Sequence, residues 1–309
     1  MAIIDTVKHK WRVSTMLMRL IYVNIAVFLV IRIGAIVCMF AGVSELVWLR
    51  WFELASMPQW LCDTPWTVVT YMFSHFDVLH ILFNMLWLYW FGTVFMLTGT
   101  QKQVFALYLY GGIGGALLYL LAFNTLPAFA GQASLLIGAS ASVIAIVVAT
   151  AVIHPEYRMG LLFIGSVSLK WIAIITLGLF MLGLTGNNAG GHVAHVGGAV
   201  VGLIYGLCFK NGRDITKPFN KLIDRMVVAF SGGVRVKRPK AKRFTKSHKK
   251  QQTETAQKQS QDKRQKDINA TPEDQAALNA ILDKIKKSGY SALTADEKRR
   301  LFEVSKRIK

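Results

Sequence analysis

A few polar side chains that could carry out nucleophilic and acid–base chemistry lie inside long apolar stretches of this sequence. They are Ser140, His195, His80 and Asn84. A serine hydroxyl becomes an effective nucleophile when a neighbouring imidazole accepts its proton. A second imidazole and an asparagine amide can donate hydrogen bonds to the oxyanion that forms on an attacked carbonyl. These residue types together indicate hydrolysis by a serine nucleophile, provided that the fold brings them together.

The spacing of small residues predicts how Ser140 and His195 meet. Small residues that recur every four positions on a helix let a second helix approach closely. One such stripe follows Ser140, and another follows His195; their members are Ala141, Ala145 and Ala149, and Gly198, Gly202 and Gly206. Packing the two stripes against each other would bring the imidazole of His195 towards the hydroxyl of Ser140. His80 and Asn84, four residues apart, share one face of a third helix.

The elements that carry these residues are long enough to cross a membrane, which takes roughly 20 apolar residues. We expect six spans, at 20–41, 76–98, 103–123, 134–153, 168–185 and 191–209. The second, fourth and sixth spans run from outside to inside. All four polar residues would then lie roughly 5–10 Å below the outer surface, with Ser140 about six residues into its span. The fold expected is an all-α polytopic membrane protein.

Composition and charge support this topology. Hydrophobic residues make up 53% of the 309-residue chain and charged residues 17%, well below the roughly 25% charged of soluble domains. Of the net charge of +19, residues 1–209 carry +3 and the remaining tail +16. The positive-inside rule places both termini in the cytoplasm. The three cysteines are far apart in the sequence, so no disulfide framework, metal site or cofactor is expected.

Each of these residues also has a purely structural interpretation. Serine in a membrane helix commonly bonds its own backbone, a histidine can join two helices, and glycine stripes usually serve packing. An ion pathway or a solute carrier is a further alternative. It is disfavoured because the spans hold no aspartate or glutamate at mid-depth and no inverted repeat is evident. Ser142 and His192 are near alternatives to the two central residues, but Ser142 lies about 200° around the helix from Ser140.

Three motifs resemble the rhomboid family of intramembrane serine proteases. They are the run 75–84 (HFDVLHILFN), the run 138–141 (GASA) and the run 194–198 (AHVGG) with Gly202. The resemblance covers roughly residues 20–209 and implies a six-span rhomboid-like bundle. It implies that Ser140 attacks the scissile carbonyl and that His195 acts as general base and acid, without a carboxylate. His80, Asn84 and the Ser140 backbone N–H would form the oxyanion hole. His75, Gly138, Gly198 and Gly202 would support the site.

The sequence departs from the family pattern at three positions. Ala141 stands where a glycine usually follows the nucleophile, and Thr67 stands where an arginine often follows the tryptophan of the first loop, here Trp66. Ile144 replaces an aromatic residue that often stacks on the catalytic histidine. We therefore expect a different anchor for the loop and a changed reaction rate, with the Ser–His pair retained.

Four parts are expected along the chain. Residues 1–19 form a cytoplasmic N-terminal segment, and residues 20–209 form the membrane domain. Residues 210–270 form a basic, largely disordered cytoplasmic linker that can contact anionic lipid headgroups. Residues 271–309 form a helical hairpin, with caps expected at 271–274 and, as a capping box, at 294–297. It resembles a short C-terminal module of some bacterial rhomboids.

The function expected is that of a serine endopeptidase that cuts single-span membrane proteins near the outer boundary of a bacterial cytoplasmic membrane. The alternative is a non-proteolytic rhomboid-like protein that binds client transmembrane helices. Binding of nucleic acid by the basic tail ranks lower, because no aromatic residues alternate with its charges and no folded motif accompanies them.

Overall fold

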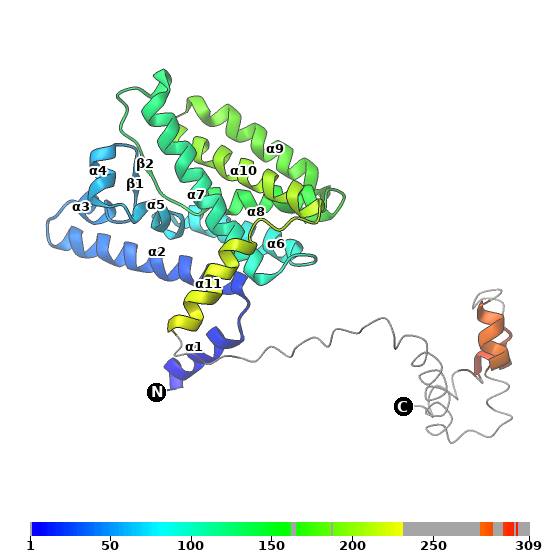
Figure 1. The fold of residues 1–309 in the computed structure, drawn as a ribbon. Helices are drawn as coiled ribbons and strands as arrows, with labels where there is room; N and C mark the ends of the chain where they lie inside the picture. Colours follow the sequence, from blue (N-terminus) through cyan, green and yellow to red (C-terminus); the bar gives the residue numbers. More distant parts are fainter. Residues whose placement is uncertain are drawn as a thin grey trace. The chain divides into compact units, whose positions relative to one another are not determined.

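The computed structural model describes residues 2–161, 165–186, 188–230, 279–286, 293–299 and 301. The chain forms two compact units, Met1–Arg235 and Val236–Lys309. The described part of the first unit is mainly helical (Figure 1). Two ribbons of two antiparallel strands accompany its helices.

Six apolar helices occupy the predicted spans. They are α2 (Met16–Phe40), α6 (Val78–Phe95), α7 (Gln101–Thr125), α8 (Ser140–Ile153), α9 (Leu169–Leu182) and α10 (Ala189–Lys210). Within the described residues, α2, α6, α7 and α10 are long and apolar enough to cross a membrane, whereas α8 and α9 have 14 residues each. The prediction of a polytopic helical membrane bundle is confirmed.

Helix α8 forms the centre of this bundle. Every residue from Ala141 to Ala151 is buried, and α6, α7, α9 and α10 all contact the helix. By contrast, α2 exposes large apolar side chains such as Ile33 and Val37, and α9 exposes Ile175 and Leu179. Apolar side chains on the outside of a bundle face lipid rather than water. The serine at the start of α8 is therefore carried by the most enclosed element of the fold.

The two predicted small-residue stripes meet in the structure. A methyl group added at Gly198 would overlap the backbone of Ala141, and one added at Gly202 would overlap the backbone of Ala145. Helix α10 therefore lies almost in backbone contact with α8, side by side along their lengths (Figure 1). From α7, Gly115 also approaches Ala141 closely. These contacts set where the N-terminal turns of α8 and α10 lie relative to each other.

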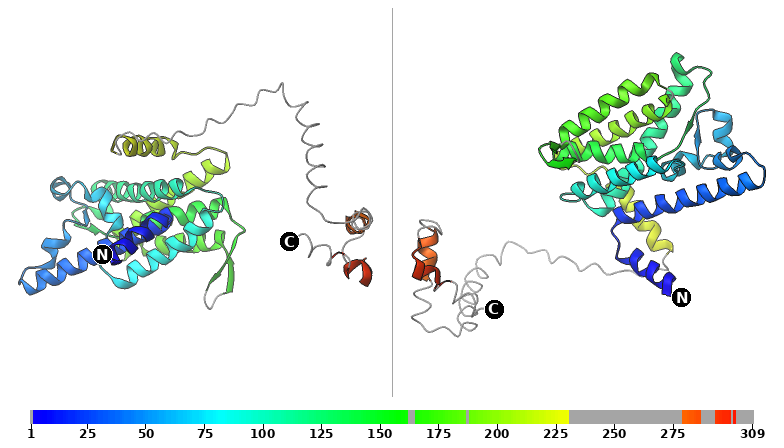
Figure 2. Two further views of the ribbon diagram at one scale, coloured as in Figure 1. Left: turned by 90° about the horizontal axis from the view of Figure 1, so that it is seen from below. Right: turned by 180° about the vertical axis from the view of Figure 1, so that it is seen from behind.

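The long connection between α2 and α6 contains most of the small elements. In chain order these are α3 (Glu45–Leu49), β1 (Leu54–Ala55), α4 (Pro58–Asp63), α5 (Thr67–Thr70) and the 3-10 turn η1 (Tyr71–Phe73). Figures 1 and 2 show α3 and α4 beside the C-terminal end of α2. Strand β1 pairs with β2 (Leu135–Leu136), just before α8, with Leu54 opposite Leu136. The connection between α2 and α6 is thus joined to the segment that precedes Ser140.

Two tryptophans anchor this loop where the family pattern has an arginine. The indole N–H of Trp66 donates to the backbone oxygen of Trp51 at 3.1 Å, and the two rings stack with centroids 5.6 Å apart. Thr67 is buried, and its hydroxyl donates to the backbone oxygen of Thr64 at 2.7 Å. Because Thr67 stands at the arginine position, the loop was expected to be held differently. It is held by the stacked indoles of Trp51 and Trp66 and by the hydrogen bond of the Thr67 hydroxyl.

The remaining elements connect the spans or lie before the first and after the last of them. They are α1 (Ala2–Val13), η2 (Pro127–Phe129), β3 (Arg158–Leu161), β4 (Gly165–Ser168), η3 (Gly183–Thr185) and α11 (Lys217–Phe230). Strands β3 and β4 pair with each other between α8 and α9. Helix α11 lies within residues 210–270, which were predicted to form a largely disordered linker. The first part of this linker is therefore helical, and the prediction was wrong there. The helical apolar spacing of α11 was obscured by the basic composition of the tail as a whole.

The second unit contains two short helical segments among the described residues, at 279–286 and 295–299. The predicted capping box is present: the N–H of Thr294 donates to Glu297 Oε2 at 2.7 Å, and the N–H of Glu297 donates to the Thr294 hydroxyl at 3.4 Å. Lys284 forms an ion pair with Glu297 at 2.8 Å. The cap expected at 271–274 lies outside the described residues.

Candidate active site

Ser140 is the first residue of α8, which differs from the expected place about six residues into a span. The residues before it descend as an extended segment instead of a helix, because β2 pairs with β1. The first four N–H groups of a helix have no partner within that helix, and the helix dipole is positive at this end. The N–H of Ser140 therefore belongs to a helix end that favours a negatively charged oxygen.

Two hydrogen bonds hold the segment that leads to Ser140. The N–H of Gly138 donates to the backbone oxygen of Tyr71 at 3.1 Å, and the N–H of Ala139 donates to Nε2 of His75 at 3.3 Å. Burial, and then the nearby His80, lower the pKa of His75 to about 3. His75 is therefore neutral at physiological pH, so that Nε2 can accept this bond. The structure gives His75 a supporting position, not one at the reacting atoms.

The imidazole of His195 lies directly against the hydroxyl of Ser140. Nε2 of His195 and Oγ of Ser140 are 2.6 Å apart, which is a short hydrogen bond between groups carried by α10 and α8. Among the described residues, none forms a hydrogen bond with the buried Nδ1 atom of His195. The two side chains therefore form a pair, a Ser–His dyad in geometry, in which no carboxylate among the described residues orients the imidazole.

His80 and Asn84 share a cavity with this dyad. The cavity, of about 350 Å³, is lined by Ser140, His195, His80 and Asn84. Its other lining residues are mostly apolar: Phe83, Trp87, Val143, Ile144, Thr176, Leu179 and Phe180. The Asn84 amide donates one bond to the backbone oxygen of His80 at 3.0 Å and carries a second N–H. Two further donors thus line the same space as the nucleophile.

Gly138 lets the nucleophile segment approach His80. Its φ angle is +127°, a conformation that L side chains rarely adopt, and a methyl group there would lie 2.6 Å from Cε1 of His80. Any larger residue would both strain the backbone and displace the imidazole. At the start of α6, Asp77 caps the helix by accepting from the N–H of His80 at 2.8 Å. Both contacts fix His80 relative to Ser140.

The two near alternatives lie elsewhere. The hydroxyl of Ser142 is buried without a hydrogen-bond partner among the described residues and faces Gly112 on α7. His192 lies one turn before His195, against Gly183, with its ring centroid 5.6 Å from that of His195. Neither residue lines the cavity that holds Ser140.

One neighbour of the dyad was missed from the sequence. The ring centroid of Phe180, on α9, is 4.2 Å from that of His195. Helix α9 is almost uniformly apolar, so no polar residue or spacing marks Phe180 among its neighbours. Only the predicted proximity of the fifth and sixth spans could have suggested it.

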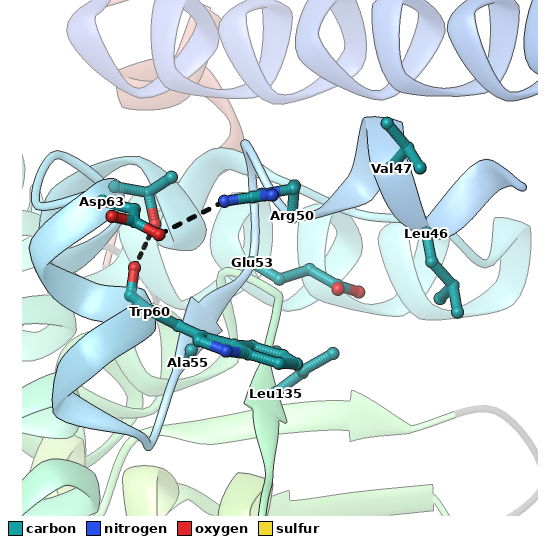
Figure 3. A pocket seen from close by; sticks show the side chains of 9 residues that line it. Leu46, Val47, Arg50, Glu53, Ala55, Trp60, Asp63 and Leu135 are labelled. Carbon is teal, nitrogen blue, oxygen red and sulfur yellow. Dashed lines mark hydrogen bonds and ion pairs between the residues drawn. The ribbon is translucent and has the colours of Figure 1, made fainter.

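A second cavity lies in the connection between α2 and α6, as Figure 3 shows. It measures about 400 Å³, and its lining includes Trp60, Glu53 and the ion pair between Arg50 and Asp63, which are 3.5 Å apart. Burial, and then Glu45, raise the pKa of Glu53. No imidazole among the described residues lines this cavity, so it lacks the proton acceptor that a serine-type reaction requires.

Comparisons with known proteins agree with these motifs. Residues 259–307 match a family of unknown function (DUF6576). RHOMBOID-like protein 12, mitochondrial, of Arabidopsis thaliana is 33% identical over 158 residues, covering 48% of this chain and 47% of the relative. Presenilin-associated rhomboid-like protein A, mitochondrial, of Danio rerio is 29% identical, covering 43% of this chain and 34% of the relative. The chain thus spans less than half the length of these relatives. Residues 63–212 match the family model for the rhomboid domain.

Proposed function

We propose that this protein is an intramembrane serine endopeptidase. The observation that carries the proposal is the distance of 2.6 Å between Nε2 of His195 and Oγ of Ser140, inside a cavity that two further hydrogen-bond donors line. His195 takes the proton of the hydroxyl as Ser140 attacks the scissile carbonyl. The same imidazole then passes that proton to the leaving amine. Water attacks the resulting acyl-enzyme with His195 again as the base, which frees the carboxylic acid product and restores Ser140.

The oxyanion of each tetrahedral intermediate is stabilised by donors on two helices. The N–H of Ser140 lies at the positive end of α8, and the side chains of His80 and Asn84 face the same cavity. Donors fixed in advance in a site of low dielectric stabilise developing charge more than water does. Gly138, Gly198 and Gly202 support this arrangement through the close approaches that they permit.

The substrates that fit this cavity are single-span membrane proteins. Its wall comes largely from α6 and α9, with apolar side chains such as Phe83, Trp87 and Leu179, and α9 is exposed to lipid on its other side. A substrate helix would enter between α6 and α9. Because helical carbonyls are already hydrogen-bonded, the substrate must unwind locally, so proline or glycine near the cut accelerates cleavage.

The topology proposed is that of a bacterial cytoplasmic membrane protein with both termini on the inside. The support for the orientation is the excess of positive charge before α2 and after α10. The basic tail then lies close to anionic headgroups, and nucleic acid binding ranks below this. Reporter fusions at residues 1 and 309 in bacterial cells test the orientation: an external reporter at either end contradicts it.

Labelling with a fluorophosphonate, together with cleavage of a reconstituted single-span substrate, tests the catalytic proposal. The wild-type protein should label and cleave, whereas Ser140→Ala should do neither and His195→Ala should lose cleavage. Ser142→Ala is the matched control, because this buried serine lies two residues away and faces α7. It should retain activity. A wild-type protein that binds client helices but neither labels nor cleaves would identify the non-proteolytic alternative.

A further inference from the structure

The orientation of the His195 imidazole needs an explanation beyond its bond to Ser140. In a catalytic triad, a carboxylate that accepts from Nδ1 holds the ring in place. Here, the buried Nδ1 atom of His195 has no hydrogen-bond partner among the described residues. A single hydrogen bond at Nε2 leaves the plane of the ring free to turn about that bond. The ring must therefore be held by the side chains that pack against its faces.

Phe180 makes the closest ring contact with His195. The two centroids are 4.2 Å apart and the planes are inclined at 50°. His192, from the other side, is 5.6 Å from His195 with its plane at 89°. Phe180 also packs against the small apolar cluster of Ile144, Val148 and Ala199, so its own ring is supported by α8 and α10. Such a contact restricts the rotation of the imidazole.

We propose that Phe180 is the positioning residue for the general base. This inference rests on the proposed function and deepens it. The position where rhomboid-like sequences often carry the stacking aromatic residue is Ile144 here, one turn below Ser140. The structure supplies a ring from α9 in its place. Because α9 also lines the cavity, the orientation of His195 depends on where α9 lies.

The test is a kinetic comparison of variants on α9. Phe180→Leu keeps an apolar side chain but removes the ring, and kcat should fall about 10-fold with KM almost unchanged, as expected for an aromatic contact that acts only on the base. Phe180→Tyr should retain activity. Adding Ile144→Phe to Phe180→Leu should restore part of kcat by supplying a ring from α8. Leu182→Ala is the matched control, because Leu182 lies two residues further along α9, is 79% exposed and does not line the cavity; it should keep the wild-type kcat.

Two outcomes overturn the proposal. Unchanged kcat in Phe180→Leu means that the ring does not position His195, and an effect confined to KM means that Phe180 contacts substrate only. In both cases an active wild-type protein with an inactive Ser140→Ala leaves the proposed function intact. An inactive wild-type protein contradicts the proposed function itself.

A separate observation concerns α11. Phe219, Leu222, Ile223, Met226 and Val227 lie on one face of this helix by spacing, and Leu222, Met226 and Val227 are 54%, 46% and 59% exposed. On the opposite side, the exposed cations are Lys217, Lys221 and Arg225.

The contacts of α11 place this face at membrane level. Phe219 contacts Phe105 and Tyr110, which belong to the membrane helix α7, with centroids 6.2 and 5.6 Å apart. An ion pair between Lys102 and Asp224 holds the helix at the same end of α7. We infer, on the topology proposed above, that α11 lies in the interface of the inner leaflet and binds anionic phospholipid with its cations. Apolar area together with basic charge is the combination that favours such binding.

Spin labels on the full chain in vesicles test this inference. Serine replaces the three cysteines Cys38, Cys62 and Cys208. A single new cysteine, Met226→Cys or Val228→Cys, then carries the label; the two positions are about 200° apart around the helix. Position 226 should be accessible to oxygen and position 228 to a water-soluble nickel chelate, with the contrast larger when phosphatidylglycerol is present. Equal nickel accessibility at both sites, or a contrast that is independent of anionic lipid, overturns the inference.

Discussion

Replacement of Gly198 by alanine tests the link between helix packing and chemistry. An ideal Cβ atom at this position would lie 2.8 Å from the carbonyl carbon of Ala141 and 3.0 Å from its Cα. Both are backbone atoms, so no side chain can rotate to relieve the overlap. Ordinary contact begins at 3.4 Å, and the carbonyl oxygen of Ala141 lies nearer still than these two atoms. Helix α10 must therefore move away from α8 by at least about 0.6 Å near Ser140.

This displacement is large enough to weaken the dyad. The 2.6 Å separation between Oγ of Ser140 and Nε2 of His195 would grow to at least about 3.2 Å, the limit for a useful hydrogen bond. Overpacking of a close contact costs about 1–3 kcal/mol of unfolding free energy. A misplacement of about 1 Å at a reacting group can cost about 100-fold in rate. We expect kcat to fall between about 10- and 100-fold.

The assay is cleavage of a reconstituted substrate, with kcat expressed per folded protein and stability measured by thermal unfolding. Gly178→Ala, on α9, makes the same chemical change where no atom lies within 4 Å of the added methyl group, and it should leave both quantities unchanged. Wild-type kcat in Gly198→Ala would refute the claim that backbone contact between α8 and α10 sets the dyad geometry. Equal losses in both variants would refute it as well.

Three other perturbations have defined outcomes. Because burial and then His80 lower the pKa of His75 from 6.5 to about 3, unfolded His75 binds a proton that the folded form does not. As the pH is lowered below 6.5, the free energy of unfolding should therefore decrease, by up to about 1.4 kcal/mol per pH unit. Unfolding in denaturing detergent, measured over a pH series, should show a smaller pH dependence in His75→Gln than in the wild type. The same pH dependence in both proteins would contradict this. If the Asn84 amide stabilises the oxyanion, Asn84→Ala should lower kcat by about 100- to 1,000-fold. The measurement is cleavage by a variant shown to be folded like the wild type, and a change in KM alone would contradict that role. Gly138→Ala should cost about 1–3 kcal/mol in backbone strain and displace His80. Its loss of cleavage should exceed that of Gly131→Ala, where φ is +72° but no atom lies within 4 Å of the added methyl group. Equal losses of cleavage in the two variants would contradict the role of the His80 contact.

The positions of the spans and the meeting of the two stripes could be predicted from the sequence. A long apolar stretch predicts a span because backbone polar groups must be satisfied internally in lipid. The small side chains of Gly198 and Ala141 predict that α10 and α8 pack closely at these positions. The start of α8 could not be predicted in this way. Leu135 and Leu136 are as apolar as the helix that follows, so hydropathy does not separate strand from helix there.

Features that depend on contacts distant in sequence were also missed. The pairing of Leu54 with Leu136 joins residues more than 80 positions apart, and neither has a local signal for a strand. Phe180 approaches His195 through the crossing of two helices, which the sequence does not specify. Helix α11 does carry a helical apolar repeat, but the basic composition of residues 210–270 favoured disorder over that shorter pattern.

The short length of α8 has a consequence for the exchange of segments between proteins. With 14 residues, α8 covers only about 21 Å of a hydrocarbon layer of about 30 Å. The missing length is taken up by chain that depends on Leu54, Tyr71 and His75 for its backbone partners. A transplanted α8 would therefore lose the depth of Ser140, and on the proposed function substitutions in the connection between α2 and α6 alter turnover without touching Ser140. Loop and nucleophile should be exchanged between proteins as one cassette.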